Sequence, residues 1–124
     1  NSKDKAISIG ERSKVAFRDI NLKRNFIGIA VKDGSSFVGN KINSLDNEYD
    51  FAIFKKKKEY SYPRANIDHY KTNAKENSYL IGKGSLLKIN KQIFDSNTED
   101  KNIFKLIYNW PCKIIATDMR GKYF

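Results

Sequence analysis

The chain has 124 residues, of which 24 are lysine or arginine and 14 are aspartate or glutamate, so its formal net charge is +10. Hydrophobic residues at 40% and charged residues at 31% are typical of one folded domain with a modest core and exclude a disordered chain. No apolar run approaches the roughly 20 residues that a membrane-spanning helix needs, and a single cysteine, Cys112, excludes an internal disulfide.

The positive charge favours a polyanionic partner, such as an anionic polysaccharide, nucleic acid or an acidic membrane surface. Lysine far outnumbers arginine, however, and asparagine and isoleucine are also abundant. AT-rich coding produces this composition without any partner, whereas a dedicated nucleic-acid binder more often uses the planar fork of arginine. Charge by itself therefore leaves both interpretations open.

From its N-terminus the chain repeats at an offset of 22 residues, with residues 5–25 aligned on residues 27–47. A third copy continues the apolar columns at residues 51–57, and a fourth begins 28 residues later, at residues 79–94. The repeat predicts that identical positions stack. One interior ladder should contain Ile7, Ile29, Phe51 and Tyr79, and two amide ladders should pair Asn21 with Asn43 and Asn25 with Asn47.

Within each copy the apolar residues alternate at period two, which indicates two or three short strands separated by turns such as GERS, KDGS and GKGS. We predict an all-β fold, a short right-handed parallel β-helix (a solenoid) of about four rungs with ~22-residue repeats over residues 1–94. The alternative is a two-sheet sandwich of similar short strands, which explains the alternation but not the fixed register.

Residues 95–124 leave the repeat and are predicted to form a C-terminal capping segment or appendage. This segment forms either a short helix around residues 103–108 or strands around Ile114 and Ile115, because its apolar residues require burial. A short solenoid exposes unpaired backbone at both ends. We therefore expect upstream domains in a longer natural protein, of which this is the C-terminal portion, or self-association through the ends.

The segments SIGERSKV and GIAVKDGS, with the asparagine positions, resemble the right-handed parallel β-helix repeats of pectate-lyase-like proteins. The stretch from GIAVKDGS to YDFAIFKKKKEY is similar to β-helix segments of large bacterial surface or secreted proteins, some of which carry a CotH-like kinase-type domain. The resemblance implies a bacterial, carbohydrate-associated protein at the cell envelope or outside the cell. It carries no catalytic residue over to this chain.

The residue types that support chemistry are sparse. Glu11 is expected to stack on Asp33, and two such carboxylates bind Ca²⁺ in principle, but a solvated turn column is the commoner arrangement. His69 is the only histidine and lies in a segment expected to be exposed, while Cys112 is expected to be a small buried residue. The GKGS segment lacks the spacing of a phosphate loop and is interpreted as a turn. We predict no enzymatic activity, no cofactor and no metal.

The most distinctive segment is FKKKKEYSYPR, residues 54–64, which lies where the repeat is interrupted. Eleven residues separate Ile53 from Ala65, whereas five separate Ile9 from Val15, so six residues are inserted. Insertions in repeat folds form loops on one face, often the binding face. The candidate ligand-binding residues, with both tyrosines expected on one side of an extended segment, are Lys55, Lys56, Lys57, Lys58, Tyr60, Tyr62 and Arg64.

Three hypotheses of function follow. The leading one is a non-catalytic module with a structural or carbohydrate-facing role in a larger bacterial protein. The second is a polyanion-binding module that uses loop 54–64, with anionic polysaccharide favoured over nucleic acid. The third is a fragment of a polysaccharide-acting enzyme whose catalytic residues lie elsewhere. The alternative to ligand binding by the loop is that its lysines keep an exposed flank soluble and its tyrosines pack on the rung below.

Overall fold

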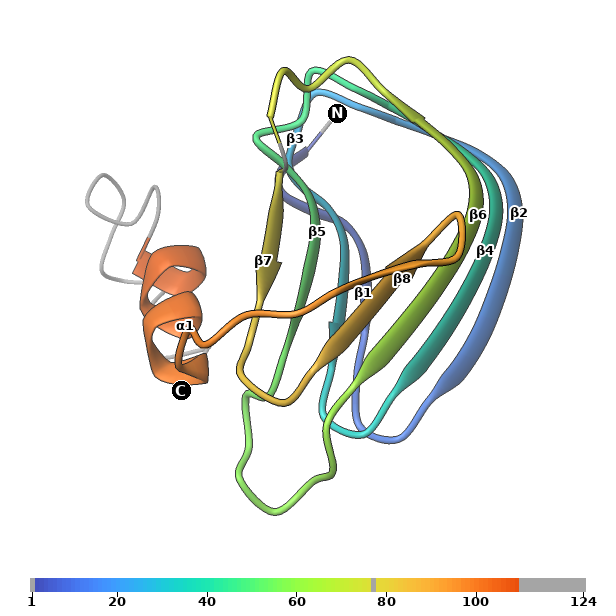
Figure 1. The fold of residues 1–124 in the computed structure, drawn as a ribbon. Helices are drawn as coiled ribbons and strands as arrows, with labels where there is room; N and C mark the ends of the chain where they lie inside the picture. The colour runs from blue at the N-terminus through green and yellow to red at the C-terminus, as the bar shows by residue number, and fades with distance from the viewer. Residues whose placement is uncertain (1, 77, 110–124) are drawn as a thin grey trace.

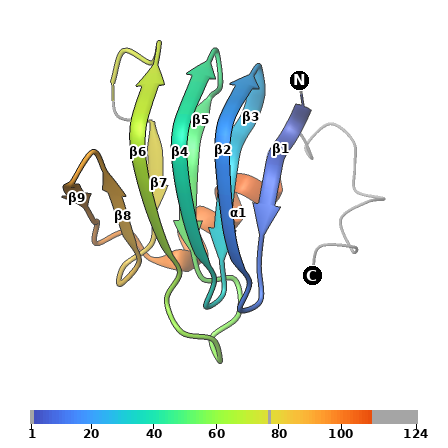
Figure 2. The ribbon, with the colours of Figure 1, turned by 90° about the vertical axis from the view of Figure 1, so that its right-hand side faces the viewer.

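The computed structural model describes residues 2–76 and 78–109, whose strands form two sheets that face each other (Figure 1). The first sheet has the order β1 (Ser2–Ile9), β3 (Asn25–Lys32), β5 (Tyr49–Phe54) and β7 (Tyr79–Ile81). The second sheet (Figure 2) has the order β2 (Lys14–Lys23), β4 (Ser36–Leu45), β6 (Arg64–Thr72), β8 (Leu86–Ile89) and β9 (Gln92–Phe94). The chain alternates between the two sheets up to β8.

The register between neighbouring strands is the one that the repeat predicts. In the first sheet Ile7 pairs with Ile29, Ile29 with Phe51 and Phe51 with Tyr79, all in parallel strands. Both amide ladders are also confirmed by hydrogen bonds between side chains. Asn43 Nδ2 donates to Asn21 Oδ1 (3.0 Å) and Asn25 Nδ2 donates to Asn47 Oδ1 (2.9 Å).

The main core lies between the two sheets. Ile29 and Phe51 of the first sheet are fully buried there, as are Ile42 and Ile67 of the second. Tyr70 and Tyr79 extend this core with tilted ring contacts to Phe51, at centroid distances of 5.2 and 5.9 Å. Burial of these apolar side chains is the main source of stability, at roughly 1.5–3 kcal/mol for each large residue.

One left-handed residue recurs in each long strand of the second sheet: Asp19 (φ 57°), Lys41 (φ 61°) and His69 (φ 55°). A residue in this conformation interrupts the strict alternation of faces, so inward positions on either side of it are three apart instead of two. In β4, residues 39 and 42 therefore both face the core, and in β6 residues 67 and 70 do the same. Each repeat therefore contributes one long bent strand where the alternation suggested two.

The predicted four-rung, right-handed parallel β-helix is wrong as an architecture. The strands form two separate sheets, of which only the first is wholly parallel, because β9 pairs with β8 antiparallel. Each repeat supplies two strands, since the bent strands β2, β4 and β6 run without a break. The sandwich alternative anticipated two sheets but not their parallel pairing. The more general prediction, that the fold is mostly β, is confirmed.

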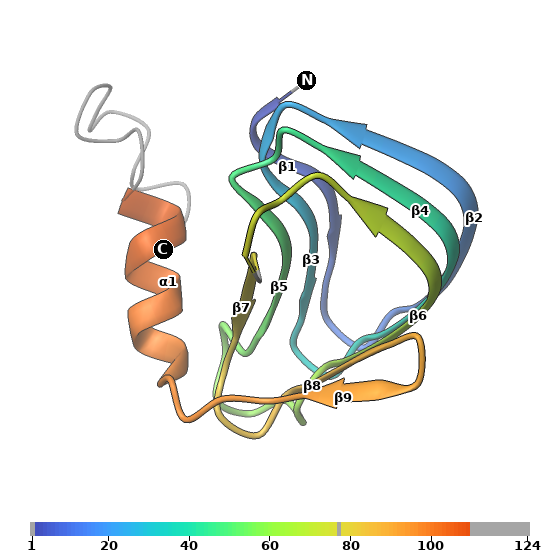
Figure 3. The ribbon, with the colours of Figure 1, turned by 45° about the horizontal axis from the view of Figure 1, so that its top comes forward.

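The helix expected around residues 103–108 is confirmed as α1 (Asp100–Asn109), but it does not close an end of the stack. It packs on the outer face of the first sheet (Figures 1 and 3), where a second core forms. Ile103 and Ile107 of α1 are buried there against Phe54 and Ala30. The strands expected around Ile114 and Ile115 lie outside the described residues.

The chain reaches α1 by crossing from the second sheet to the first after β9 (Figure 3). Thr98 of this crossing segment accepts a hydrogen bond from Lys83 N (2.8 Å), which ties it to the turn between β7 and β8. The carbonyl of Glu99 then accepts the first helical bond from Asn102 N (3.0 Å). This route places the beginning of α1 beside the loop that follows β5.

Among the described residues, no helix has the length and apolar character needed to cross a membrane.

Candidate functional site

The insertion predicted from the repeat is the loop that connects the two sheets after β5. β5 ends at Phe54 and β6 begins at Arg64, so residues 55–63 form this connection, which we call the basic loop. It projects beyond the ends of the strands at the bottom of Figure 1. Phe54 is buried under α1 and Arg64 is exposed on β6, so the two ends of the predicted stretch belong to strands.

Two carboxylates from other parts of the chain hold the start of the basic loop. Asp33 Oδ1 accepts hydrogen bonds from the backbone N–H groups of Lys56 (2.7 Å) and Lys57 (2.8 Å). Asp100 Oδ1, in the first turn of α1, accepts one from the backbone N–H of Lys55 (2.9 Å). Bonds to a charged acceptor are stronger than neutral ones, so the backbone of the three lysines is fixed.

The lysine side chains of the loop have different neighbours. Lys57 Nζ forms an exposed ion pair with Glu11 Oε2 at 2.7 Å, and this hydrogen bond lowers the pKa of Glu11 and raises the pKa of Lys57. Lys55 Nζ lies 4.2 Å from the centre of the Tyr62 ring, a cation–π distance, and donates to the carbonyl of Lys58 (3.4 Å). Lys58 itself is exposed.

These lysines line an open pocket of about 510 Å³ between the basic loop, the turn after β7 and the first turn of α1. Within residues 2–76 and 78–109, Lys55, Lys56, Lys58 and Lys83 form no ion pair. The acidic residues of the pocket are already engaged, because Asp100 holds the loop and Glu99 lies 3.7 Å from the ammonium of Lys101. The pocket is lined by Lys55, Lys56, Lys57, Lys58, Tyr62, Lys83, Glu99, Asp100, Lys101 and Phe104.

The two tyrosines of the loop do not lie together as the sequence predicted. Residues 60–62 are not a strand, and each ring contacts a different neighbour. The Tyr60 ring lies 5.1 Å from the guanidinium of Arg12, whereas Tyr62 lines the pocket beside Lys55. Only Tyr62 is therefore placed to contact a molecule in the pocket.

The GKGS segment is a turn, as predicted, and it also shapes the pocket. Ser85 N donates to the carbonyl of Gly82 (2.9 Å), and Gly84 has a left-handed φ of 93°. A Cβ atom on Gly82 would collide with Asp100 Oδ1, and one on Gly84 would lie 2.6 Å from the Tyr62 ring. Both glycines are needed for the close approach of the groups that form the pocket wall.

Glu11 and Asp33 were predicted to form a column of solvated side chains, which is wrong for Asp33, because it is 2% exposed. Both carboxylates bind the basic loop instead. His69 is exposed, as predicted, with Nδ1 2.9 Å from Asn40 Oδ1. Cys112 lies outside the described residues.

A second polar cluster surrounds the buried carboxylate of Asp50, which is 1% exposed. Its oxygens accept hydrogen bonds from the hydroxyl groups of Ser44 (2.5 Å), Thr72 (2.6 Å) and Tyr70. Burial, and then the hydrogen bond to Asp50, raises the pKa of Tyr70. These contacts join β4, β5 and β6 from both sheets and enclose the carboxylate, so the cluster stabilises the fold and is not a binding site.

Sequence reasoning found the loop lysines but not the groups that hold or complete the pocket. Lys83, Lys101 and Phe104 are far from the loop in the sequence and meet it only because α1 folds back on the first sheet. One signal was available: Asp33 precedes Lys55 by 22 residues, so the repeat places its carboxylate next to the start of the loop.

No protein-family model, curated protein or solved structure matches this chain. The resemblance to pectate-lyase-like and CotH-like proteins therefore stays a prediction from the sequence.

Proposed function

We propose that this chain is a non-catalytic binding module that holds a negatively charged polymer, with anionic polysaccharide favoured over nucleic acid. The observation that carries the proposal is the pocket beside α1, where lysine side chains gather on a backbone fixed by Asp33 and Asp100. Because this backbone is already fixed, less conformational entropy is lost when the lysine side chains bind an anion.

The charge balance of the pocket supports an anionic ligand. Among the described residues, six lysines line it against two acidic residues, Glu99 and Asp100, and both acids already have partners. A cationic or neutral ligand gains nothing from this arrangement, whereas each sulfate or carboxylate group of a polymer gains charge-assisted hydrogen bonds. A structural role in a larger protein explains a soluble flank but gives no reason for lysines around a concave surface.

The preference for polysaccharide over nucleic acid rests on the side chains that are present. None of the arginines that the structure describes lines the pocket, although arginine is the residue that reads phosphate and base edges bidentately. Tyr62 is the only loop tyrosine that reaches it, so successive bases have no row of rings on which to stack. The ammonium group of lysine is a point charge without a preferred plane, so it binds the sulfate and the carboxylate groups of a polysaccharide equally well.

The test compares two variants that each lose four positive charges. The pocket variant changes four lysines to glutamine, Lys55, Lys56, Lys58 and Lys83. The control variant changes four exposed lysines away from the pocket in the same way, Lys14, Lys23, Lys71 and Lys75.

Elution from a heparin column with increasing salt measures the binding. We expect the pocket variant to elute at clearly lower salt and the control variant to elute close to the wild type, because only the pocket lysines contact the ligand together. Equal losses in both variants would mean that net charge alone causes retention. Stronger competition by single-stranded DNA than by heparin would assign the pocket to nucleic acid instead.

A further inference from the structure

A second group of lysines lies beyond the pocket, around the ring of Tyr108 near the end of α1. Lys5 Nζ lies 4.7 Å and Lys56 Nζ 4.8 Å from the ring centre. Lys32 Nζ donates to the phenolic oxygen of Tyr108 at 3.4 Å. The three lysines come from β1, β3 and the basic loop, so tertiary folding alone brings them together.

Like charges crowd around Lys32. Burial, and then the neighbouring ammonium groups of Lys5 and Lys56, lowers the pKa of Lys32 to about 8. The carboxylates of Asp4 and Asp33 offset this only in part, because Asp4 pairs with Lys5 (2.9 Å) and Asp33 holds the loop backbone. An anionic group placed beside these lysines would relieve their repulsion.

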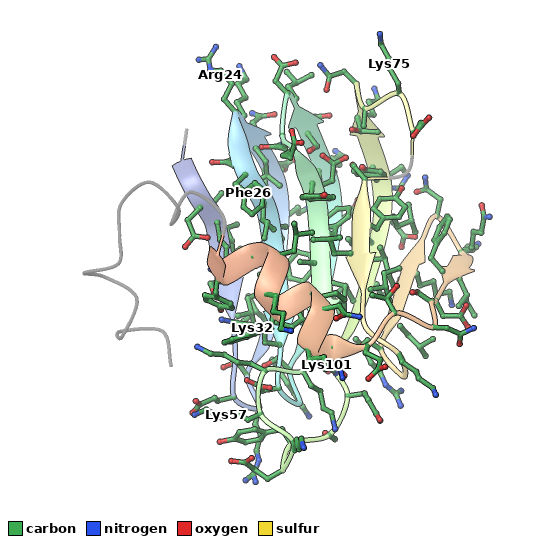
Figure 4. The ribbon with its side chains drawn as sticks, turned by 90° about the vertical axis from the view of Figure 1, so that its left-hand side faces the viewer. Arg24, Phe26, Lys32, Lys57, Lys75 and Lys101 are labelled. Atoms are coloured by element: carbon green, nitrogen blue, oxygen red, sulfur yellow. The ribbon has the colours of Figure 1, made fainter. Side chains whose placement is uncertain are left out.

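The Tyr108 group and the pocket form one continuous basic stripe along α1. Lys56 belongs to both, because it lines the pocket and also reaches Tyr108. Phe104 likewise lines the pocket and packs against Tyr108, with ring centres 4.6 Å apart. Figure 4 shows Lys32, Lys57 and Lys101 on the same side of α1.

The helix sets the length of this stripe. Asp100, at the pocket, and Tyr108 are eight residues apart on α1, which is about 12 Å along the helix axis. A single sulfate or phosphate group is too small to contact both ends. A chain with several anionic groups is able to do so.

We propose that the ligand is an extended polymer that lies along α1, with one anionic group in the pocket and a later one beside Lys32 and Lys56. This inference rests on the proposed function, because it takes the pocket as the first point of contact. It adds a length requirement to the proposed polymer, which must reach from the pocket to the lysines around Tyr108, and it assigns Lys32 as a determinant of ligand length.

The experiment measures the affinity of the full chain for a heparin disaccharide and for a heparin octasaccharide by isothermal titration calorimetry. The test variant is Lys32→Gln, and Lys32→Arg is the matched control because it keeps the charge. Thermal melting checks that each variant folds. Lys32→Gln removes a crowded charge, so we expect no loss of stability.

In the wild type the octasaccharide should bind more tightly than the disaccharide. Lys32→Gln should weaken the octasaccharide by about fivefold, the effect of one ion pair of about 1 kcal/mol, and leave the disaccharide unchanged. Lys32→Arg should behave as the wild type. Equal affinities for the two ligands, or an equal effect of Lys32→Gln on both, would overturn the extended ligand while leaving the pocket intact. If neither ligand binds the wild type, the proposed function fails with it.

Discussion

Asp33 is the residue on which the basic loop depends most, and Asp33→Ala is the sharpest test of that role. The carboxylate is 2% exposed and accepts two backbone hydrogen bonds, from Lys56 and Lys57. A hydrogen bond to a charged group contributes about 1.5–3 kcal/mol to stability. The lower end applies here, because the backbone N–H groups of the released loop form hydrogen bonds with water instead. The two bonds together therefore contribute about 3 kcal/mol. Asp33 also has a φ of 44°, which costs alanine about 1 kcal/mol more. We expect a total loss of about 4 kcal/mol.

Urea unfolding followed by circular dichroism measures this loss, and Asp46→Ala is the matched control. Asp46 has a similar φ of 57° but holds only one exposed side-chain bond, from Asn73 Nδ2 (2.7 Å). Its replacement should cost about 1.5 kcal/mol. Trypsin should also cut native Asp33→Ala after the loop lysines faster than native wild type. Equal unfolding free energies for the two variants, with unchanged cleavage, would show that Asp33 does not anchor the loop.

Four further outcomes are expected. Asp50→Ala should lower the unfolding free energy by about 3 kcal/mol, because three hydroxyl groups lose their acceptor; a loss below that of an exposed alanine variant would contradict this. The pKa of Lys32 is lowered from 10.5 to about 8, so between these two pH values the unfolded chain binds more protons than the folded chain. The free energy of unfolding in urea should therefore rise with pH above about 8. Lys32→Gln should reduce this increase. Ile29→Asp should abolish cooperative thermal unfolding, because it places a charge in the main core; a normal melting curve would contradict the buried ladder. Gly82→Ala should displace the Asp100 carboxylate and lower heparin affinity, and retention equal to the wild type would show that this contact is dispensable.

The repeat in the sequence predicted which residues pair, because stacked strands place equivalent residues side by side. Ile7, Ile29 and Phe51 lie in register as expected, and the asparagine ladders form. The same pattern left open whether each repeat forms two strands or three, and the structure has two. A left-handed residue such as Asp19 bends a strand without ending it, and neither composition nor alternation distinguishes such a bend from a turn.

The candidate site was predicted only as far as it is continuous in the sequence. Residues 55–58 and Tyr62 line the pocket, but Tyr60 turns to Arg12 and Arg64 belongs to β6. The position of α1 was also not predictable, since an amphipathic helix fits either the end of a stack or the outside of a sheet. The outer face of β3 and β5 is apolar at Ala30, Ala52 and Phe54, and in the folded chain that face is where α1 packs.

The sequence by itself determined the 22-residue register, the position of the inserted loop and its positive charge. These features are local or periodic, and a periodic chain brings equivalent residues together wherever its strands lie. Tertiary structure alone decided that the strands form two sheets, that Asp33 and Asp100 hold the loop, and that Lys32, Lys56 and Lys83 flank α1. Such contacts join residues far apart in sequence, and their geometry depends on how the helix and both sheets bury their apolar faces together.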